Sequence, residues 1–255
     1  MKVIAVIPAR MASTRFPGKP LAKINGHSMI EHVYRRVQCA RLIDEVYLAT
    51  CDEEIASESE KFDGKVIMTS SSHTRGMDRV VEAAKKIEAD IVINVQGDEP
   101  TVDPNTLDGA ISYFKQETDI QCLNLTAPIR EWRVFINENV VKTVTDKNNK
   151  VLYFSRQPIP TQTQKDFKSA IKQAGVYLIQ KEVLVKFASW RESPLEIAER
   201  VDMLRFLENG YSIYAFESRD MVGVDTPEDI ALVEQIFVND PLYCKLFSGK
   251  DKKTS

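Results

Sequence analysis

Two short runs of β-branched and other apolar residues, each followed by polar loop residues, constrain the fold of this chain most. Residues 3–7 form one run, which is followed by Pro8. Residues 91–95 form the other, which is followed by Gln96, Gly97 and Asp98. Continuous apolar runs of this length are typical of strands that are covered on both faces of a parallel sheet. The chain is therefore expected to build its core around such a sheet.

Predicted helices and strands alternate between these two runs. The elements expected from apolar periodicity are helices over 29–38, 53–62 and 77–87 and strands over 45–50 and 66–68. Repeated β-α-β units with right-handed crossovers build a doubly wound sheet, which binds ligands beyond the carboxyl ends of its strands. We therefore predict the α/β class, with the loops after the two apolar runs at one site.

The pattern changes between about residues 120 and 190, where prolines and polar loops separate short strands. The strands expected there are 120–126, 140–145, 151–155 and 174–179. We interpret the region as a small, mostly antiparallel insertion that closes over a mostly parallel sheet. The remaining predicted elements are a helix over 195–209, a strand over 211–217 and a helix from Thr226 to about Phe237. Residues 1–255 are expected to form a single domain with this insertion.

Charge and composition argue against several classes of function. The 34 basic and 37 acidic residues give a formal charge of −3 and are mixed along the chain, so a nucleic-acid partner is not expected. The apolar runs are far shorter than a membrane span, and the first residues lack the features of a signal peptide, so we expect a cytoplasmic protein without membrane contact. The four cysteines lack C-x-x-C spacing, which predicts neither a zinc site nor disulfides.

The loop after the first strand combines positive side chains with small residues. Its cations are Arg10, Arg15 and Lys19, and Ser13 and Gly18 are among its small residues. Accessible backbone N–H groups and positive side chains together suit a triphosphate. A solvated basic loop is the alternative, but the position at the end of a strand favours phosphate binding. The loop matches neither the Walker nor the dinucleotide glycine pattern, which disfavours kinases and dehydrogenases.

Two aspartates are candidate metal ligands. Asp98 directly follows a buried strand, where a carboxylate is costly unless it meets a cation, so we expect it to bind Mg²⁺. Asp225 precedes the predicted helix start at Thr226, and there turn chemistry and metal binding explain the residue equally well. With only three histidines in the chain, a histidine-based mechanism has little support.

Five segments, in order along nearly the whole chain, resemble the CMP-Kdo synthetase family, the 3-deoxy-manno-octulosonate (Kdo) cytidylyltransferases. These segments are the first loop and residues 92–100, 153–156, 193–196 and 223–229. The resemblance implies a fold of the nucleotide-diphospho-sugar transferase type and transfer of a cytidylyl group from CTP to Kdo, with release of pyrophosphate, for lipopolysaccharide synthesis. It also implies a Mg²⁺ cofactor and a homodimer.

The resemblance further implies roles for individual residues. Asp98 and Asp225 would coordinate Mg²⁺ and would act in catalysis together with Arg10 and Lys19. The residues expected to bind the nucleotide are Arg10, Ser13, Arg15, Lys19, Arg79 and Gln96. The residues expected to bind the acidic sugar are Arg156, Gln173, Tyr177, Glu196 and Glu199. A guanidinium suits a carboxylate, so Arg156 is the strongest of these, although each could instead support the fold of the insertion.

Three places depart from the family's pattern. The segment 73–79 keeps Arg79 but differs from the usual His-x-x-Gly-Thr-Glu-Arg, Gln173 replaces a histidine, and Met203 replaces a glutamine. We expect these positions on the sugar side, where fewer polar partners would weaken recognition of Kdo itself. The alternative acceptors are therefore a Kdo variant such as 8-amino-3,8-dideoxy-manno-octulosonate, another sugar acid or a phosphonate. A rival of another class of function is a non-catalytic nucleotide-binding regulator.

Overall fold

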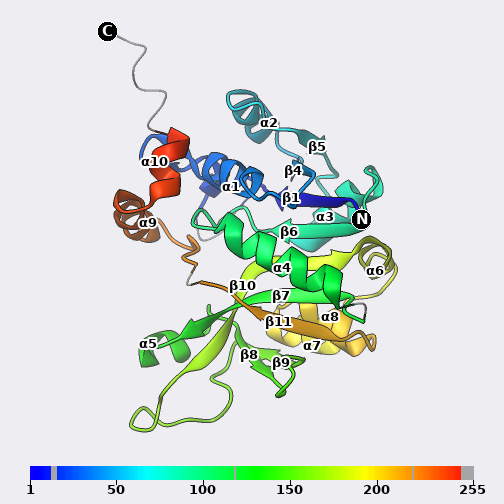
Figure 1. The fold of residues 1–255 in the computed structure, drawn as a ribbon, viewed down its shortest axis with the longest axis vertical. Helices are drawn as coiled ribbons and strands as arrows, with labels where there is room; N and C mark the ends of the chain where they lie inside the picture. Colours follow the sequence, from blue (N-terminus) through cyan, green and yellow to red (C-terminus); the bar gives the residue numbers. More distant parts are fainter. Residues whose placement is uncertain (13–15, 118, 220, 248–255) are drawn as a thin grey trace.

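The computed structural model describes residues 1–12, 16–117, 119–219 and 221–247, which are arranged around one long β-sheet (Figure 1). The strands of this sheet are β1 (Val3–Pro8), β4 (Glu45–Thr50), β5 (Val66–Met68), β6 (Ile91–Val95), β7 (Cys122–Ile129), β8 (Lys142–Thr145), β9 (Val151–Ser155), β10 (Ala170–Gln180) and β11 (Ile213–Glu217). They follow the order β11-β7-β10-β6-β1-β4-β5, with β8 beside β10 and β9 beside β8. A separate hairpin contains β2 (Lys23–Ile24) and β3 (His27–Ser28).

The pairing of the strands matches the predicted class. β6, β1, β4 and β5 are parallel neighbours, and β11 is parallel to β7. The antiparallel pairing expected within 120–190 is also present, because β10 runs antiparallel to β7 and β8. However, β10 also pairs directly with β6, so β7 and β10 extend the central sheet. The expectation that this region closes over the sheet is therefore wrong.

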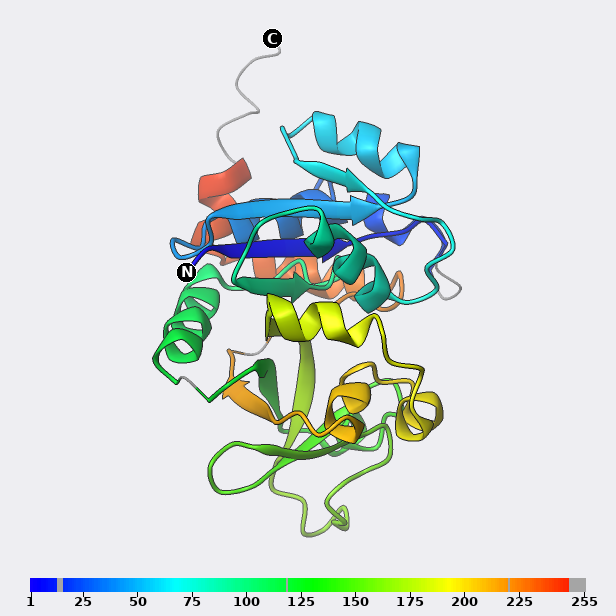
Figure 2. The same ribbon diagram turned by 90° about the vertical axis from the view of Figure 1, so that its right-hand side faces the viewer.

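Helices cover both faces of the sheet (Figures 1 and 2). They are α1 (Met29–Gln38), α2 (Glu53–Glu60), α3 (Gly76–Lys85), α4 (Pro104–Gln116), α5 (Trp132–Phe135), α6 (Lys181–Phe187), α7 (Pro194–Glu199), α8 (Met203–Glu208), α9 (Asp229–Val238) and α10 (Pro241–Phe247), with a short 3₁₀ turn, η1, at Lys19–Leu21. Within the described residues, each helix is too short or too polar to cross a bilayer.

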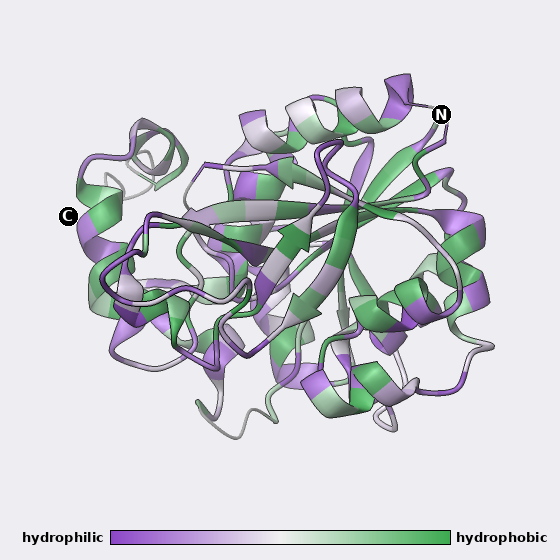
Figure 3. Cartoon of the chain, turned by 90° about the horizontal axis from the view of Figure 1, so that it is seen from below, coloured by the Kyte–Doolittle hydropathy of each residue, from purple (hydrophilic) through white to green (hydrophobic). Residues whose placement is uncertain are grey.

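The sequence of β1 explains why both faces are covered. Val3 and Ile7 pack with apolar residues of α1 and α4, whereas Ile4 and Val6 pack with those of α3, α6 and α8. Successive side chains of a strand point to opposite faces, so a wholly apolar strand needs a hydrophobic layer on each side. Hydrophobic residues are accordingly concentrated along the central strands (Figure 3). The predicted doubly wound arrangement is confirmed.

The helix predicted over 195–209 is interrupted. α7 ends at Glu199, Arg200 adopts a left-handed conformation with φ of 55°, and α8 begins at Met203. The break lets the fully buried Glu196 meet Arg205, with 2.5 Å between Oε1 and Nη2. In a continuous helix, residues nine positions apart would be separated by about 13 Å along the axis. The ion pair therefore requires the break.

The last helices also differ from the prediction. α9 begins at Asp229, three residues beyond Thr226, because the Asp229 carboxylate accepts hydrogen bonds from the backbone of Asp225 and Thr226 at 2.9 and 2.8 Å. α10 was not predicted. It follows an ion pair between Asp240 and Arg36 of α1, so the end of the described chain is attached to the first helix.

Candidate active site

Two adjoining cavities lie where the strand order reverses between β1 and β6. The first-loop cavity, about 270 Å³, is lined by the loop after β1 and the start of α3. The β10 cavity, about 400 Å³, is lined by residues of β10, the segment after β9 and residues 221–225. Gln96 and Asp98 line both cavities. Open α/β sheets bind ligands at such a reversal, as the sequence predicted for these loops.

The first-loop cavity brings together most of the predicted nucleotide-binding residues. Arg10, Lys19, Arg79 and Gln96 all line it, whereas Ser13 and Arg15 lie outside the residues that the structure describes. The loops after β1 and β6 touch closely here, because a Cβ at Gly97 would lie 2.9 Å from the carbonyl oxygen of Pro8. Glycine at this position therefore allows the two loops to share one site.

Arg79, which was predicted to bind the nucleotide, makes several hydrogen bonds within the protein through its guanidinium. Its side chain is buried, and its guanidinium donates to the hydroxyl of Thr69, the carbonyl of Ser70 and the sulfur of Cys51. These partners belong to the segments that follow β4 and β5. The contacts favour a role in shaping the wall of the cavity over direct contact with a phosphate.

Lys19 links Asp98 to Val224, the residue before Asp225, the other candidate metal ligand. Its Nζ lies 2.5 Å from Asp98 Oδ2 and donates to the carbonyl of Val224 at 2.8 Å. The backbone N–H of Val224 in turn donates to the carbonyl of Asp98 at 2.9 Å. Asp98 and Asp225, which both line the β10 cavity, are thus brought to one place from distant parts of the sequence.

The donor set at this place suits Mg²⁺. Among the described residues, no three His, Cys, Asp or Glu side chains are arranged to hold a metal ion. Mg²⁺ does not need such a cage, because it usually binds one or two carboxylates together with substrate phosphates and retained waters. The carboxylates of Asp98 and Asp225, next to a cavity lined by Arg10 and Lys19, match that requirement.

A bulge in β10 shapes the second cavity. The register shifts between Gln173 and Tyr177, and Asn124 donates to the carbonyls on both sides of Gly175, at 3.0 Å each. The N–H of Gly175 donates to Glu99 Oε1 at 3.0 Å. A Cβ at Gly175 would lie 2.7 Å from that oxygen, so the close approach requires glycine.

Two buried polar atoms beside the bulge have no hydrogen-bond partner among the described residues. These atoms are Gln173 Nε2 and Glu99 Oε2. Both side chains line the β10 cavity together with Tyr177. Burial, followed by the charge of Asp98, raises the pKa of Glu99 to about 7. Buried polar atoms without partners are rare in folded proteins, so these two point to a polar ligand.

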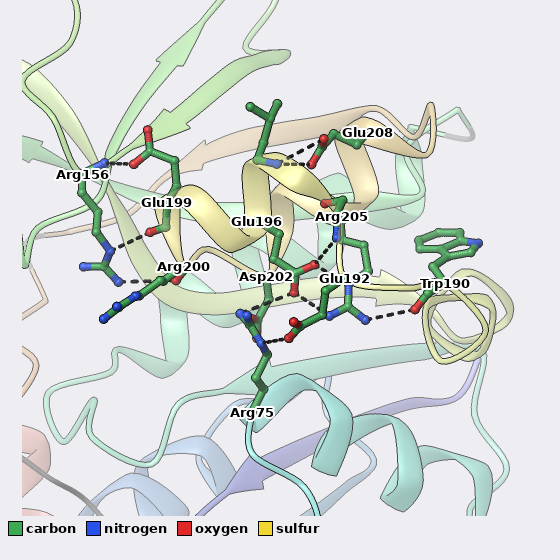
Figure 4. A network of polar contacts seen from close by, with 12 residues as sticks. Arg75, Arg156, Trp190, Glu192, Glu196, Glu199, Arg200, Asp202, Arg205 and Glu208 are labelled. Carbon is green, nitrogen blue, oxygen red and sulfur yellow. Dashed lines mark hydrogen bonds and ion pairs between the residues drawn. The ribbon is translucent and has the colours of Figure 1, made fainter.

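Arg156 lines this cavity, and several hydrogen bonds fix its position. Glu199 Oε2 accepts from the backbone N–H of Arg156 at 2.8 Å, and the carbonyl of Glu199 accepts from Nε at 2.7 Å (Figure 4). The fully buried Lys142 donates to the carbonyls of Asn137, Val140 and Arg156. Glu199 itself does not line the β10 cavity, so its place favours positioning of Arg156 over contact with a ligand.

Two residues predicted on the sugar side lie elsewhere. Glu196 is fully buried outside both cavities, and its carboxylate accepts from Arg205 and from the backbone of Ser193. Met203 is 1% exposed and packs in the hydrophobic core with α3 and α6. The prediction that Glu196 contacts the acceptor is therefore wrong, as is the sugar-side position of Met203. Gln173 and Tyr177 do line the β10 cavity.

The structure adds polar residues that the sequence did not single out. Glu99, Lys172 and Asp202 line the β10 cavity with Arg156. Asp202, which directly precedes Met203, is the residue of this segment that lines the β10 cavity. Lys172 is one residue before Gln173, so regular alternation along a strand would place the two side chains on opposite faces and does not predict that both line one cavity.

Comparisons with known proteins agree with this geometry. A sequence model of the cytidylyltransferase family matches residues 4–218. The 3-deoxy-manno-octulosonate cytidylyltransferases of Geobacter metallireducens and Syntrophotalea carbinolica are each 44% identical to this chain, covering 90% and 92% of it and 95% and 98% of their own lengths. A solved CMP:2-keto-3-deoxy-manno-octonic acid synthetase, in complex with CTP, is 36% identical with a TM-score of 0.87, covering 93% of this chain and 99% of its own.

The family model includes the first loop and β10 but ends before residues 221–225, which also line the β10 cavity; the fold of the solved structure agrees over 93% of this chain. The chain therefore belongs to the cytidylyltransferase family, among the 3-deoxy-manno-octulosonate cytidylyltransferases that the sequence resembled.

Proposed function

We propose that this protein transfers a cytidylyl group from CTP to 3-deoxy-manno-octulosonate and releases pyrophosphate. The observation that carries the proposal is the meeting of two polar cavities at Asp98, one with cations and one with unpaired polar atoms. A transfer reaction needs two substrates whose reacting atoms adjoin. The names of the relatives supply the identities of both substrates.

In this reaction the triphosphate occupies the first-loop cavity. Arg10 and Lys19 hold its phosphate oxygens, and Lys19 also links them to Asp98. An acceptor hydroxyl oxygen forms a bond to the α-phosphorus, the bond from that phosphorus to the bridging oxygen breaks, and pyrophosphate leaves. The proton of the hydroxyl goes to solvent. Positioning and charge neutralisation suffice for such a displacement, so no covalent intermediate on the protein is needed.

The acidic sugar occupies the β10 cavity. Arg156, whose position is fixed by Glu199 and Lys142, pairs with the sugar carboxylate. Gln173 and Tyr177 contact its hydroxyl groups, which supply the partner that Gln173 Nε2 lacks within the described residues. Asp98 and Asp225 would hold Mg²⁺, which would supply positive charge beside the phosphates and make the acceptor hydroxyl easier to deprotonate.

The proposal also includes the identity of the acceptor, the location of the protein and its assembly. Kdo is the acceptor named for the relatives, and its 8-amino variant is the second candidate, because Gln173 lines the cavity in place of the family's histidine. The product would feed lipopolysaccharide synthesis in the cytoplasm. A homodimer, which the resemblance to the family implies, can be tested by sedimentation equilibrium.

The decisive experiment measures pyrophosphate release for each nucleoside triphosphate against Kdo, its 8-amino analogue and sialic acid. CTP with Kdo is expected to give the highest kcat/KM. Higher turnover with the 8-amino analogue would keep the reaction and change the acceptor. The absence of release with every pair would favour the non-catalytic nucleotide-binding regulator.

A further inference from the structure

Arg75 lies at the wall of one cavity and pairs with an acid, Asp202, at the wall of the other. With Gly76, which starts α3 beside Gln96, it lines the first-loop cavity. Its guanidinium extends toward the α7–α8 segment, where Nε lies 2.7 Å from Glu192 Oε1 and Nη1 lies 2.8 Å from Asp202 Oδ1 (Figure 4). The family pattern described above leaves this position unspecified.

Asp202 is the acid of this group that faces the β10 cavity. Its side chain is 24% exposed and lines that cavity, while Oδ1 accepts from Arg75. Burial raises the pKa of the Asp202 carboxyl, and the hydrogen bond from Arg75 opposes that rise. Arg75 therefore favours a charged Asp202 in one orientation.

The neighbouring cation cannot replace Arg75. Arg205 uses Nε and Nη2 on the carboxylate of Glu196, at 2.6 and 2.5 Å. Nη1 of Arg75 also lies 3.4 Å from Glu196 Oε1, so this one nitrogen separates the carboxylates of Glu196 and Asp202. Without Arg75, Asp202 would lose its cation and would be repelled by the neighbouring acid.

We propose that Arg75 is a positioning residue that fixes the Asp202 carboxylate on the wall of the β10 cavity and thereby sets the affinity for the acceptor. The inference rests on the proposed function, since it takes that cavity to be the acceptor site. A fixed carboxylate favours binding of an acceptor that presents a hydrogen-bond donor to it, either a hydroxyl or an ammonium group. Arg75 thus acts through Asp202 and does not itself touch the acceptor.

The test compares Arg75→Met, Asp202→Asn and the double variant, using CTP and the acceptor that the wild type prefers among Kdo, its 8-amino analogue and sialic acid. Arg75→Met is expected to raise the acceptor KM about tenfold or more and to change the CTP KM by less than about twofold. Because both residues act as one unit, the double variant should be less than about twofold worse than Asp202→Asn alone. Glu192→Gln is the control, because that side chain is 49% exposed and should change the acceptor KM less than about twofold.

Equal increases in both KM values, or a double variant whose loss is the product of the single losses, would overturn the inference. Arg75→Lys keeps a charge that reaches Asp202 and should give an acceptor KM between those of the wild type and Arg75→Met; if the methionine variant does not fold, the lysine variant and Asp202→Asn provide the same comparison. A wild type that releases no pyrophosphate with any acceptor would reject the proposed function and the inference with it. An active wild type whose acceptor KM is insensitive to Arg75 would reject the inference alone.

Discussion

Lys19 and Asp98 are joined by an ion pair, with 2.5 Å between Nζ and Oδ2, at the point where the two cavities meet. The pair holds a cation and a carboxylate next to each other through contacts within the protein. In the proposed reaction, Asp98 would contribute its remaining oxygen to a metal ion and Lys19 would face the triphosphate.

Asp98→Asn is expected to lower kcat by at least about a hundredfold while leaving the protein folded. The amide keeps the shape of the side chain but removes the charge that pairs with Lys19 and attracts Mg²⁺. The measurement is pyrophosphate release at increasing Mg²⁺, with a thermal melt as the check on folding. A variant that keeps most of the wild-type rate at all Mg²⁺ concentrations would contradict the assignment of Asp98 as a ligand.

Lys142→Met should raise the acceptor KM about tenfold and leave the CTP KM within about twofold. Lys142 is fully buried and donates to three carbonyls, one of them that of Arg156, so its loss frees the segment that carries the acceptor-binding guanidinium. The exposed Lys147→Met is the matched control. If both substrates were affected alike, Lys142 would serve the fold as a whole.

Glu196→Gln is expected to lower the free energy of unfolding by about 3 kcal/mol. The change removes one charge of a fully buried pair and leaves Arg205 without a counter-ion at hydrogen-bond distance. Denaturant unfolding measures the loss, and Glu182→Gln on the exposed surface of α6 should change the stability by less than about 0.5 kcal/mol. Similar losses in the two variants would show that the Glu196–Arg205 pair contributes little to the free energy of unfolding.

Gln173→His and Met203→Gln should behave differently, although both restore residues of the family's pattern. Gln173 lines the β10 cavity, so its change should alter the ratio of kcat/KM between Kdo and the 8-amino analogue. Met203 lies in the core, where a glutamine amide would be buried without an assured partner and should cost about 2 kcal/mol of stability. An unchanged acceptor ratio in Gln173→His would show that this departure does not affect specificity.

The free energy of unfolding should fall as the pH falls from about 6.5 to about 4, partly because of His32. Burial lowers the pKa of its imidazole to about 4, whereas the unfolded chain takes up the proton near 6.5. The unfolded state therefore binds more protons in that window, which corresponds to a loss of up to about 3 kcal/mol that is complete below pH 4.

His32→Phe, which can still pack beside Phe237 and Phe247, should reduce this pH dependence. The difference between wild type and variant unfolding energies at several pH values isolates the contribution of the one residue. A difference that does not change with pH would contradict the depressed pKa of His32.

The sequence was sufficient where a feature depends on local pattern. β1, β6 and α1 were predicted within one residue of their observed ends, because a buried strand and an amphipathic helix each have a distinct period. The placement of Asp98 followed from the rule that doubly wound sheets bind ligands at their carboxyl ends.

The sequence was insufficient where a feature depends on a distant partner. The break after Glu199 is explained by the meeting of Glu196 and Arg205, and the helical pattern through both residues gives no sign of it. Asp202 becomes a wall of the β10 cavity only because this break turns the chain there. Met203 fits a helix facing either the core or a ligand, and only the packing decides between them.

The position of β10 between β6 and β7 has a consequence for the order in which the chain can assemble. β6 is followed by β7 in the sequence, but the strand that joins them in the sheet is synthesised later than both. A nascent chain can pair β1, β4, β5 and β6 soon after they leave the ribosome, whereas one edge of β6 stays unpaired until β10 has emerged. The first-loop cavity, whose lining residues all precede β7 and β10 in the sequence, can therefore be formed well before the sheet is complete, and the β10 cavity is the last part of the candidate site to form.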